Sequence, residues 1–258
     1  MDLKARLSRN EPTLGLWVTL EAASVTEIAG NLGLDWVVID TEHSALDFRE
    51  VLDHVRAAAR TKTAPLVRIP EIEEGSIKRI LDAGAEGILV PMVRSAEDVR
   101  RAVKFAKYPP AGIRGIAVER ATNWGLNLKD YLERANRETV VIPIIENVEA
   151  SDDFDAIVDV PGVSALFFGP FDFAASMGQL GVWNHPEVWS RIESMRKKAH
   201  IKGMPLGIMG ASADEAKRRV QEGYRMIAIG IDSLLMIRSL TDMMTALGRP
   251  LPKGGWSG

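Results

Sequence analysis

The sequence predicts a closed (β/α)8 barrel, and three features of it support that fold class. Short apolar runs rich in Val, Ile and Leu recur eight times along the 258 residues. The runs are continuous rather than alternating, as expected of strands that are covered on both faces. Helical patterns separate them, and strands that alternate with helices indicate parallel βαβ units. Eight such units in about 250 residues match a barrel, whereas a doubly wound open sheet, the alternative, rarely needs eight evenly spaced units.

The predicted strands are short and leave room for a helix after each one. Their continuous apolar character indicates a barrel wall with packed side chains on both its inner and outer faces. In chain order they are LGLWVTL (14–20), DWVVID (35–40), APLVRIP (64–70), GILVPMV (87–93), TVVIPIIEN (139–147), VSALFFG (163–169), MPLGIMG (204–210) and RMIAIGID (225–232).

Helical periodicity fills the intervals after the strands. Ser76, Ser95 and Ser212 are candidate caps or first-turn residues. The interval 108–136 departs from the rhythm, because its prolines and glycines forbid a regular helix at its start. We expect a long connection there, and long connections in compact barrels are usually functional. The predicted helices are 22–33, 47–60, 75–83, 95–106, 148–159, 186–202, 212–222 and 233–247.

Composition narrows the class of protein. We expect one domain over residues 1–258, with a frayed C-terminal tail from about residue 250. A net charge of −3 gives no electrostatic case for binding nucleic acid. The chain has no cysteine, which excludes thiol nucleophiles and zinc–thiolate sites. It shows neither a signal peptide nor a membrane-spanning run, so we expect a soluble, cytoplasmic protein.

Polar side chains gather where the predicted strands end. The run DWVVIDTEHSALDF (35–48) passes abruptly from apolar residues into Asp40, Glu42 and His43. In a barrel of this type the reaction site lies at the carboxyl ends of the strands. The DTEH stretch is therefore expected to emerge at the working face. The polar or aromatic residues of the other runs are Trp17, Arg68, Glu146, Asn147 and Asp172.

Glu146 and Asp172 indicate a metal site. They follow consecutive strands, which lie about 4.8 Å apart in a sheet, and two carboxylates that close repel each other unless a cation or a shared proton intervenes. A hard divalent ion such as Mg²⁺ or Mn²⁺ takes one or two carboxylates and keeps several waters. The alternative for each acid is that it caps the helix that follows.

Arg68 and His43 are candidate catalytic residues. Arg68 lies within an apolar run, so it either pairs with a protein carboxylate or meets an anionic substrate. His43 is either a structural histidine or a proton acceptor beside a metal-bound water. The remaining histidines, His54, His185 and His200, fall on or near outer helices and are expected at the surface.

Five blocks of sequence resemble the HpcH/HpaI aldolase family, the metal-dependent class II pyruvate aldolases. The resemblance covers roughly residues 12–248, and the order and spacing of all five blocks make it specific. The blocks are DWVVIDTEHSALDF, PLVRIP, LDAGAEGILVPMVRSAEDVRRAV, YPPAGIRGI and FFGPFDFAASMG.

The resemblance implies an activity and roles for individual residues. It implies cleavage of a 4-hydroxy-2-oxo acid to pyruvate, or a related 2-oxo acid, and an aldehyde through an enolate. Mg²⁺ or Mn²⁺, with Co²⁺ as a further candidate, would bind Glu146 and Asp172. His43 would be the base, Asp82 the acid that orients it, and Arg68 the group that stabilises the enolate oxygen. The residues around the substrate would be Trp17, Arg68, Gly169, Pro170, Phe171 and Asp172.

The resemblance also implies a homo-oligomer, commonly a hexamer, in which the last helix is exchanged between subunits. The segment 233–247 agrees, because it is apolar on much of its circumference and one barrel wall would satisfy only one face. A Met-rich helix that fills its own core, in a monomer or a dimer, is the alternative.

No Schiff-base lysine is required for the implied reaction, and the predicted strand interiors contain no lysine.

Several positions depart from the family pattern. Ile144 stands where many members carry glutamine, Thr41 where glycine is frequent, and Phe171 and Phe173 where smaller residues are usual. Ile144, Phe171, Phe173 and Trp17 predict an apolar pocket for the aldehyde. Two other functions remain open, namely a carbon–carbon lyase that acts on an acyl-CoA thioester and a barrel that binds a metabolite without catalysis.

Overall fold

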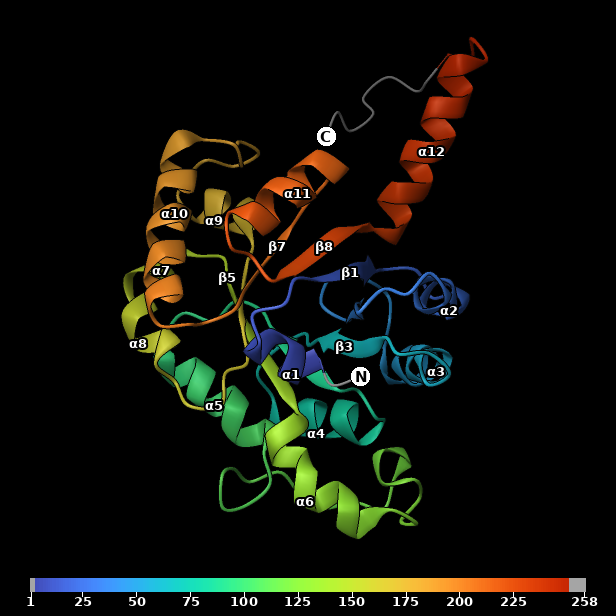
Figure 1. Ribbon diagram of the computed structural model, residues 1–258, viewed down its shortest axis with the longest axis vertical. Helices are drawn as coiled ribbons and strands as arrows, with labels where there is room; N and C mark the ends of the chain where they lie inside the picture. Colours follow the sequence, from blue (N-terminus) through green and yellow to red (C-terminus); the bar gives the residue numbers. More distant parts are fainter. Residues whose placement is uncertain (1–2, 251–258) are drawn as a thin grey trace.

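The eight predicted strands close into a parallel barrel in the computed structural model, which describes residues 3–250 (Figure 1). Neighbours along the chain pair in order, and β8 pairs with β1 to complete the ring. The tail expected from about residue 250 lies outside these residues, apart from Pro250. The strands are β1 (Thr13–Val18), β2 (Trp36–Asp40), β3 (Ala64–Arg68), β4 (Gly87–Val90), β5 (Val140–Ile145), β6 (Leu166–Phe168), β7 (Leu206–Met209) and β8 (Met226–Ile231).

Helices surround the barrel and agree with the sequence pattern in most places. Ser95 and Ser212 are N-caps whose side chains accept backbone N–H bonds, whereas Glu73 rather than Ser76 caps the helix after β3. The helices are α1 (Leu3–Ser8), α2 (Ser24–Asn31), α3 (Phe48–Ala58), α4 (Glu74–Asp82), α5 (Ala96–Ala106), η1 (Arg120–Thr122), α6 (Leu128–Glu138), α7 (Val148–Asp152), α8 (Phe154–Val158), α9 (Pro170–Ser176), α10 (Pro186–Ile201), α11 (Ala213–Gln221) and α12 (Asp232–Ala246).

Three differences from the prediction have local causes. The segment expected as one helix at 148–159 is two short helices, α7 and α8, with a break at Asp153. The connection after α5 contains α6, whose helical pattern begins only beyond the prolines and glycines that mark a loop. The short helices α1 and α9 escaped notice because six or seven residues carry little periodicity.

The interior of the barrel and the space between strands and helices form separate apolar cores. Trp36, Leu66 and Ile142 belong to the interior core, and Leu7 of α1 packs against it at the amino end. Val51, Ile77 and Phe154 belong to the outer core between the strands and the helical ring. Strand residues therefore alternate between the two cores, and this alternation decides which side chains reach the mouth of the barrel.

The last helix, α12, does not lie against the barrel of its own chain. It projects outward from the end of β8 (Figure 1), and Ile237 and Met243 are 56% and 61% exposed. A Met-rich helix that fills its own core is therefore excluded, because its apolar side chains face away from that core. Among the described residues, no helix is both long and apolar enough to cross a bilayer.

Candidate active site

Strand alternation brings five residues to one layer at the carboxyl end of the barrel. Trp36 and Val38 of β2 face the interior, so Asp40 at the end of this strand faces inward as well. The same period of two places Arg68 above Ala64 and Leu66, and Glu146 above Ile142 and Ile144. By the same alternation, the layer is completed by Trp17 of β1 and by Gly169 after β6.

Asp40 and Arg68 form the centre of this layer. They are partners in the register between β2 and β3, so their side chains start side by side. The Arg68 Nε donates to Asp40 Oδ1 at 2.9 Å, and Nη2 donates to Oδ2. The Arg68 guanidinium also lies over the Trp17 ring, 5.1 Å from its centroid. Of the two alternatives for Arg68, the protein carboxylate is present in the structure.

The Asp40 carboxylate also organises the turn after β2. Its Oδ1 accepts the backbone N–H groups of Glu42 and His43 at 3.0 and 3.3 Å, and its Oδ2 accepts the Trp17 indole N–H at 3.3 Å. Burial acts to raise the pKa of Asp40. The hydrogen bonds and charge of Arg68 outweigh it and hold that pKa below the ordinary value. Asp40 is therefore ionised, and both of its carboxylate oxygens accept hydrogen bonds.

Glu42 and His43 stand above this pair. Glu42 Oε2 lies 2.7 Å from Arg68 Nη1 and 3.8 Å from His43 Nε2. Burial raises the pKa of Glu42 against the attraction of Arg68 and His43, and Asp40 and Asp172 repel it further. The His43 side chain is 65% exposed, so its imidazole faces the open mouth of the barrel.

Glu146 is a buried carboxylate with one backbone donor. It is 3% exposed, and its Oε1 accepts the Met92 N–H at 2.6 Å. Met92 adopts a φ of 52°, a strained conformation for a side chain of this kind. Burial raises the pKa of Glu146 to about 7, and the charges of Asp172 and Glu42 add to the shift. Gly169 leaves the space this carboxylate needs, because a Cβ there would lie 2.8 Å from Glu146 Oε2.

Asp172 comes from the first turn of α9, which begins directly after β6 with Pro170 at its start. It is exposed, and its charge acts on both Glu146 and Glu42. Four carboxylates therefore meet one guanidinium at this mouth, and the surplus of negative charge suits a cation. Glu146 and Asp172 supply hard oxygen donors of the kind that Mg²⁺, Mn²⁺ and Co²⁺ accept. Residues 3–250 hold no cluster of three or more acids, histidines or cysteines arranged for a metal ion.

Within one chain the hydrogen-bond partner of Asp82 is Arg114, so the role of Asp82 as the acid that orients His43 stays a prediction. Asp82 ends α4, shortly before β4 begins, so it lies toward the amino end of the barrel, away from the DTEH turn. There it accepts a hydrogen bond from the fully buried Arg114 at 2.6 Å, and Arg114 also lies over the Tyr108 ring. The sequence block that contains Asp82 gave no sign of this partner.

Lys107 tests the prediction that no Schiff-base lysine is present. Burial, followed by the charges of Lys4 and Arg114, lowers its pKa to about 7, which would suit an amine nucleophile. Its Nζ, however, donates to the carbonyl groups of Asn136 and Thr139, and Thr139 directly precedes β5. Lys107 therefore lies at the amino end and cannot reach the acids at the mouth.

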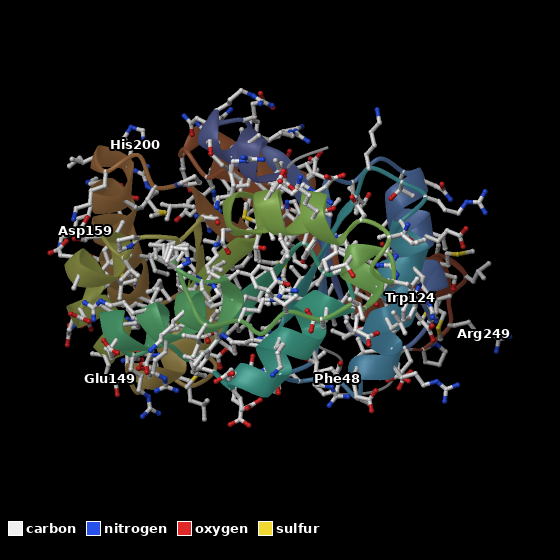
Figure 2. The ribbon with its side chains drawn as sticks, turned by 90° about the horizontal axis from the view of Figure 1, so that it is seen from below. Phe48, Trp124, Glu149, Asp159, His200 and Arg249 are labelled. Carbon is white, nitrogen blue, oxygen red and sulfur yellow. The ribbon has the colours of Figure 1, made fainter. Side chains whose placement is uncertain are left out.

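The other three histidines differ in how far they are buried. His185 is partly exposed, and His200 lies at the outer edge of the molecule on α10 (Figure 2), as expected. The surface assignment of His54 is wrong, because its side chain is fully buried and its Nδ1 lies 2.7 Å from Thr26 Oγ1. Burial also lowers the pKa of His54. It joins α3 to α2, a contact that helical periodicity alone does not reveal.

The residues expected to line an apolar pocket lie in different places. Phe173 is wholly buried in the outer core, and Ile144 belongs to the barrel interior, so the expectation for Phe173 is wrong. Phe171 is 49% exposed, and its ring lies 5.3 Å from that of Trp183. Thr41 bonds the carbonyl group of Arg68 through both its backbone N–H and its hydroxyl, and so fixes the turn after β2.

Sequence reasoning did not assign roles to Asp40, Glu42, Met92 and Trp183. The pairing of Asp40 with Arg68 could have been found by aligning the ends of consecutive strands, since these are the last residues of β2 and β3. Met92 acts through its backbone, which leaves no trace in residue type. Trp183 depends on the path of a loop, and periodicity does not predict such a path.

Comparisons with known proteins agree with one another. The family model described as HpcH/HpaI aldolase/citrate lyase matches residues 13–239. A hydroxypyruvate/pyruvate aldolase from Pseudomonas aeruginosa is 36% identical over 98% of this chain and 96% of its own. A 4-hydroxy-2-oxo-heptane-1,7-dioate aldolase from Escherichia coli is 37% identical over 96% and 95%. The crystal structure of an HpcH/HpaI aldolase/citrate lyase family protein from Burkholderia cenocepacia superposes with a TM-score of 0.91 at 35% identity, covering 95% of this chain and 98% of that one.

Replacing Asp40 with asparagine should destabilise the fold strongly. Asp40→Asn keeps the size of the side chain but leaves the buried Arg68 charge with only Glu42 opposite it. Breaking a buried ion pair from one side costs on the order of 3 kcal/mol of unfolding free energy. Urea unfolding followed by tryptophan fluorescence measures this cost. Asp53→Asn, an acid on α3 with a solvent-exposed ion pair, is the matched control and should change little. Equal stability of the two variants would contradict the central place given to Asp40.

Proposed function

Because the chain belongs to the HpcH/HpaI aldolase/citrate lyase family, we propose that it is a divalent-metal-dependent aldolase that cleaves a 4-hydroxy-2-oxo acid to pyruvate, or a related 2-oxo acid, and an aldehyde. The observation that carries this proposal is the buried Glu146 carboxylate beside Asp172, with one arginine in the same layer. The aldolase names of the relatives from Pseudomonas aeruginosa and Escherichia coli support the same reaction class.

Glu146 and Asp172 would hold the cation. Their surplus negative charge, and the raised pKa of Glu146, fit a site whose charge is balanced only when a metal ion is present. When bound, a divalent ion supplies positive charge to the carboxylate and keto oxygens of the 2-oxo acid. The remaining chemistry can be assigned to side chains of this chain.

The reaction breaks the C3–C4 bond of the substrate. The C4 hydroxyl loses its proton and becomes the aldehyde carbonyl, and the electron pair of the broken bond moves into the C2–C3 enolate. His43 presents an exposed imidazole at the mouth and takes the hydroxyl proton. Arg68 donates hydrogen bonds to the enolate oxygen through the N–H groups that Asp40 does not occupy. A proton delivered to C3 then gives the methyl group of pyruvate.

The Gly169–Asp172 segment is assigned to the substrate carboxylate. Gly169 and the first turn of α9 stand beside Glu146, and backbone N–H groups at a helix start are donors for anions. Trp17 closes the apolar side of the layer, stacked on Arg68 and bonded to Asp40. Phe171 and Trp183 form an aromatic pair next to Asp172, which favours aldehydes less polar than a polyhydroxylated sugar.

Two other functions are less favoured. A lyase acting on an acyl-CoA thioester would need basic side chains for the CoA phosphates, but Arg68 is already engaged by Asp40 and Glu42 and the rest of the described layer is acidic or apolar. A barrel that only binds a metabolite has no need of an exposed imidazole next to Glu42 or of a buried carboxylate at Glu146. Metal-dependent pyruvate release from several 4-hydroxy-2-oxo acids separates all three functions.

We also propose a homo-oligomer, most simply a hexamer with exchanged α12 helices. The exposed apolar side chains of α12 continue along the whole helix, and Ile28 of α2 and Leu32, just after α2, are exposed as well. A helix with an uncovered apolar stripe needs another surface to bury it. A second copy of the chain supplies that surface through the same helix.

Metal removal should abolish pyruvate formation. Chelator-treated protein is expected to release no pyruvate until Mg²⁺, Mn²⁺ or Co²⁺ is returned. Glu146→Gln should lower both cation affinity and turnover by about 10²-fold or more, because it removes a charged donor. Calorimetry and a coupled pyruvate assay measure the two quantities. Glu149→Gln, at the periphery in Figure 2, is the control and should leave both unchanged. Full activity in chelator would refute the proposal.

His43→Ala should lower turnover by about 10²-fold, the usual contribution of a positioned base. Cation affinity should survive, because His43 is not among the proposed ligands. His200→Ala, on the outer edge of α10, is the control variant and should keep the wild-type turnover. If both variants turn over at the wild-type rate, His43 has a structural role only.

Light scattering at low micromolar concentration should show an oligomer. Leu240→Glu places a charge on the exposed stripe of α12 and should shift the mass toward smaller species. Ile201→Glu, at an equally apolar and more exposed position on α10, should not. A wild-type monomer at this concentration would rule out the proposed assembly.

A further inference from the structure

We propose that Glu42 is a positioning residue that holds Arg68 and His43 in their working orientations through a single carboxylate oxygen. The inference rests on the proposed aldolase function and adds a residue to which no role has been given. It starts from one atom, Glu42 Oε2, which lies 2.7 Å from Arg68 Nη1 and 3.8 Å from His43 Nε2.

The contact with Arg68 positions the guanidinium without saturating it. Asp40 occupies Nε and Nη2, which leaves Nη1 as the nitrogen directed away from that pair. Glu42 attracts Nη1 by charge, yet Oε2 makes no well-aligned hydrogen bond among the described residues. The N–H groups of Nη1 therefore stay available for an incoming oxygen, while the plane of the guanidinium is held from both sides.

The contact between Glu42 and His43 supplies the imidazole with a carboxylate partner from its own chain. Asp82 lies toward the other end of the barrel and is bonded to Arg114. Asp40 is closer in sequence, but its two oxygens already accept bonds from Arg68, Trp17 and two backbone N–H groups. Glu42 is the carboxylate whose oxygen remains within reach of His43 Nε2.

The position of Glu42 is costly, and this favours a functional role. Its oxygen Oε2 is buried, and the charges of Asp40 and Asp172 repel the Glu42 carboxylate. A neutral side chain of the same size would relieve that repulsion and would still fill the space. What a neutral side chain cannot do is attract a guanidinium and an imidazole at once.

Glu42 should therefore act on the chemical step more than on substrate binding. A guanidinium or an imidazole that is misplaced by about 1 Å can lose up to about 10²-fold in rate while the ground-state complex is little affected. Glu42→Gln keeps the volume and removes the charge. We expect kcat to fall by about 10-fold or more and KM for the 2-oxo acid to change much less.

The test measures exchange of pyruvate methyl hydrogens with deuterium and the kcat and KM of aldol cleavage for the wild type, Glu42→Gln, Glu42→Asp, His43→Ala and the double variant Glu42→Gln/His43→Ala. Glu71→Gln is the control, since Glu71 is an exposed acid just beyond β3 with no described partner at the site. Circular dichroism verifies folding. If Glu42→Gln does not fold, Glu42→Asp, which retains the charge on a shorter side chain, provides the comparison.

The proposal expects Glu42→Gln to lose rate, Glu42→Asp to lose less, and the double variant to lose less than the product of the two single losses. Kinetics of Glu42→Gln equal to those of Glu71→Gln would overturn it, as would fully multiplicative losses in the double variant or equal losses in the Gln and Asp variants. Absence of exchange and cleavage in the wild type would instead contradict the aldolase function itself.

Discussion

The ion pair between Asp40 and Arg68 joins the dry interior of the barrel to its polar mouth. Below it the inward side chains of β2 and β3 are apolar, and a guanidinium could not be buried there without an anion opposite it. The register of the two strands supplies that anion at the same level. Because Asp40 also accepts the N–H groups of Glu42 and His43, the shape of the turn that carries the proposed base depends on this one carboxylate.

The second constraint is an excess of negative charge that the chain does not neutralise. Glu146 keeps a single backbone donor from Met92, and Gly169 leaves its other oxygen open. A protein that only needed to fill this space would place an apolar residue at position 146, as it does two residues earlier with Ile144. The strained backbone of Met92 and the absent Cβ at Gly169 are both explained if this carboxylate must stay in place for a cation.

Much of the fold was predictable because all eight strands carry continuous apolar runs. Glu146, Arg68 and His43 were found because each is a polar residue at or just beyond the carboxyl end of such a strand. Other features depend on contacts between residues far apart in the sequence, and local periodicity does not predict such contacts. Asp82 was assigned to His43 by family resemblance, but the fold of one chain pairs it with Arg114. Phe173 follows Asp172 in sequence, yet one step around a helix turns it from the mouth into the outer core. The outward course of α12 leaves exposed the apolar side chains that the sequence pattern of 233–247 had indicated as too many for one barrel wall.

We propose that Glu146 is a carboxylate kept in a costly position for a divalent ion. Its pKa is raised to about 7, so a proton competes with the cation below that value. The most direct test is calorimetric titration of chelator-treated protein with Mn²⁺ at about pH 6 and about pH 8, in buffers of different ionisation enthalpy. We expect tighter binding at the higher pH and release of a proton on binding at the lower pH, and we expect Glu146→Gln to lose both effects. Affinity that is independent of pH, or unchanged by that substitution, would contradict it.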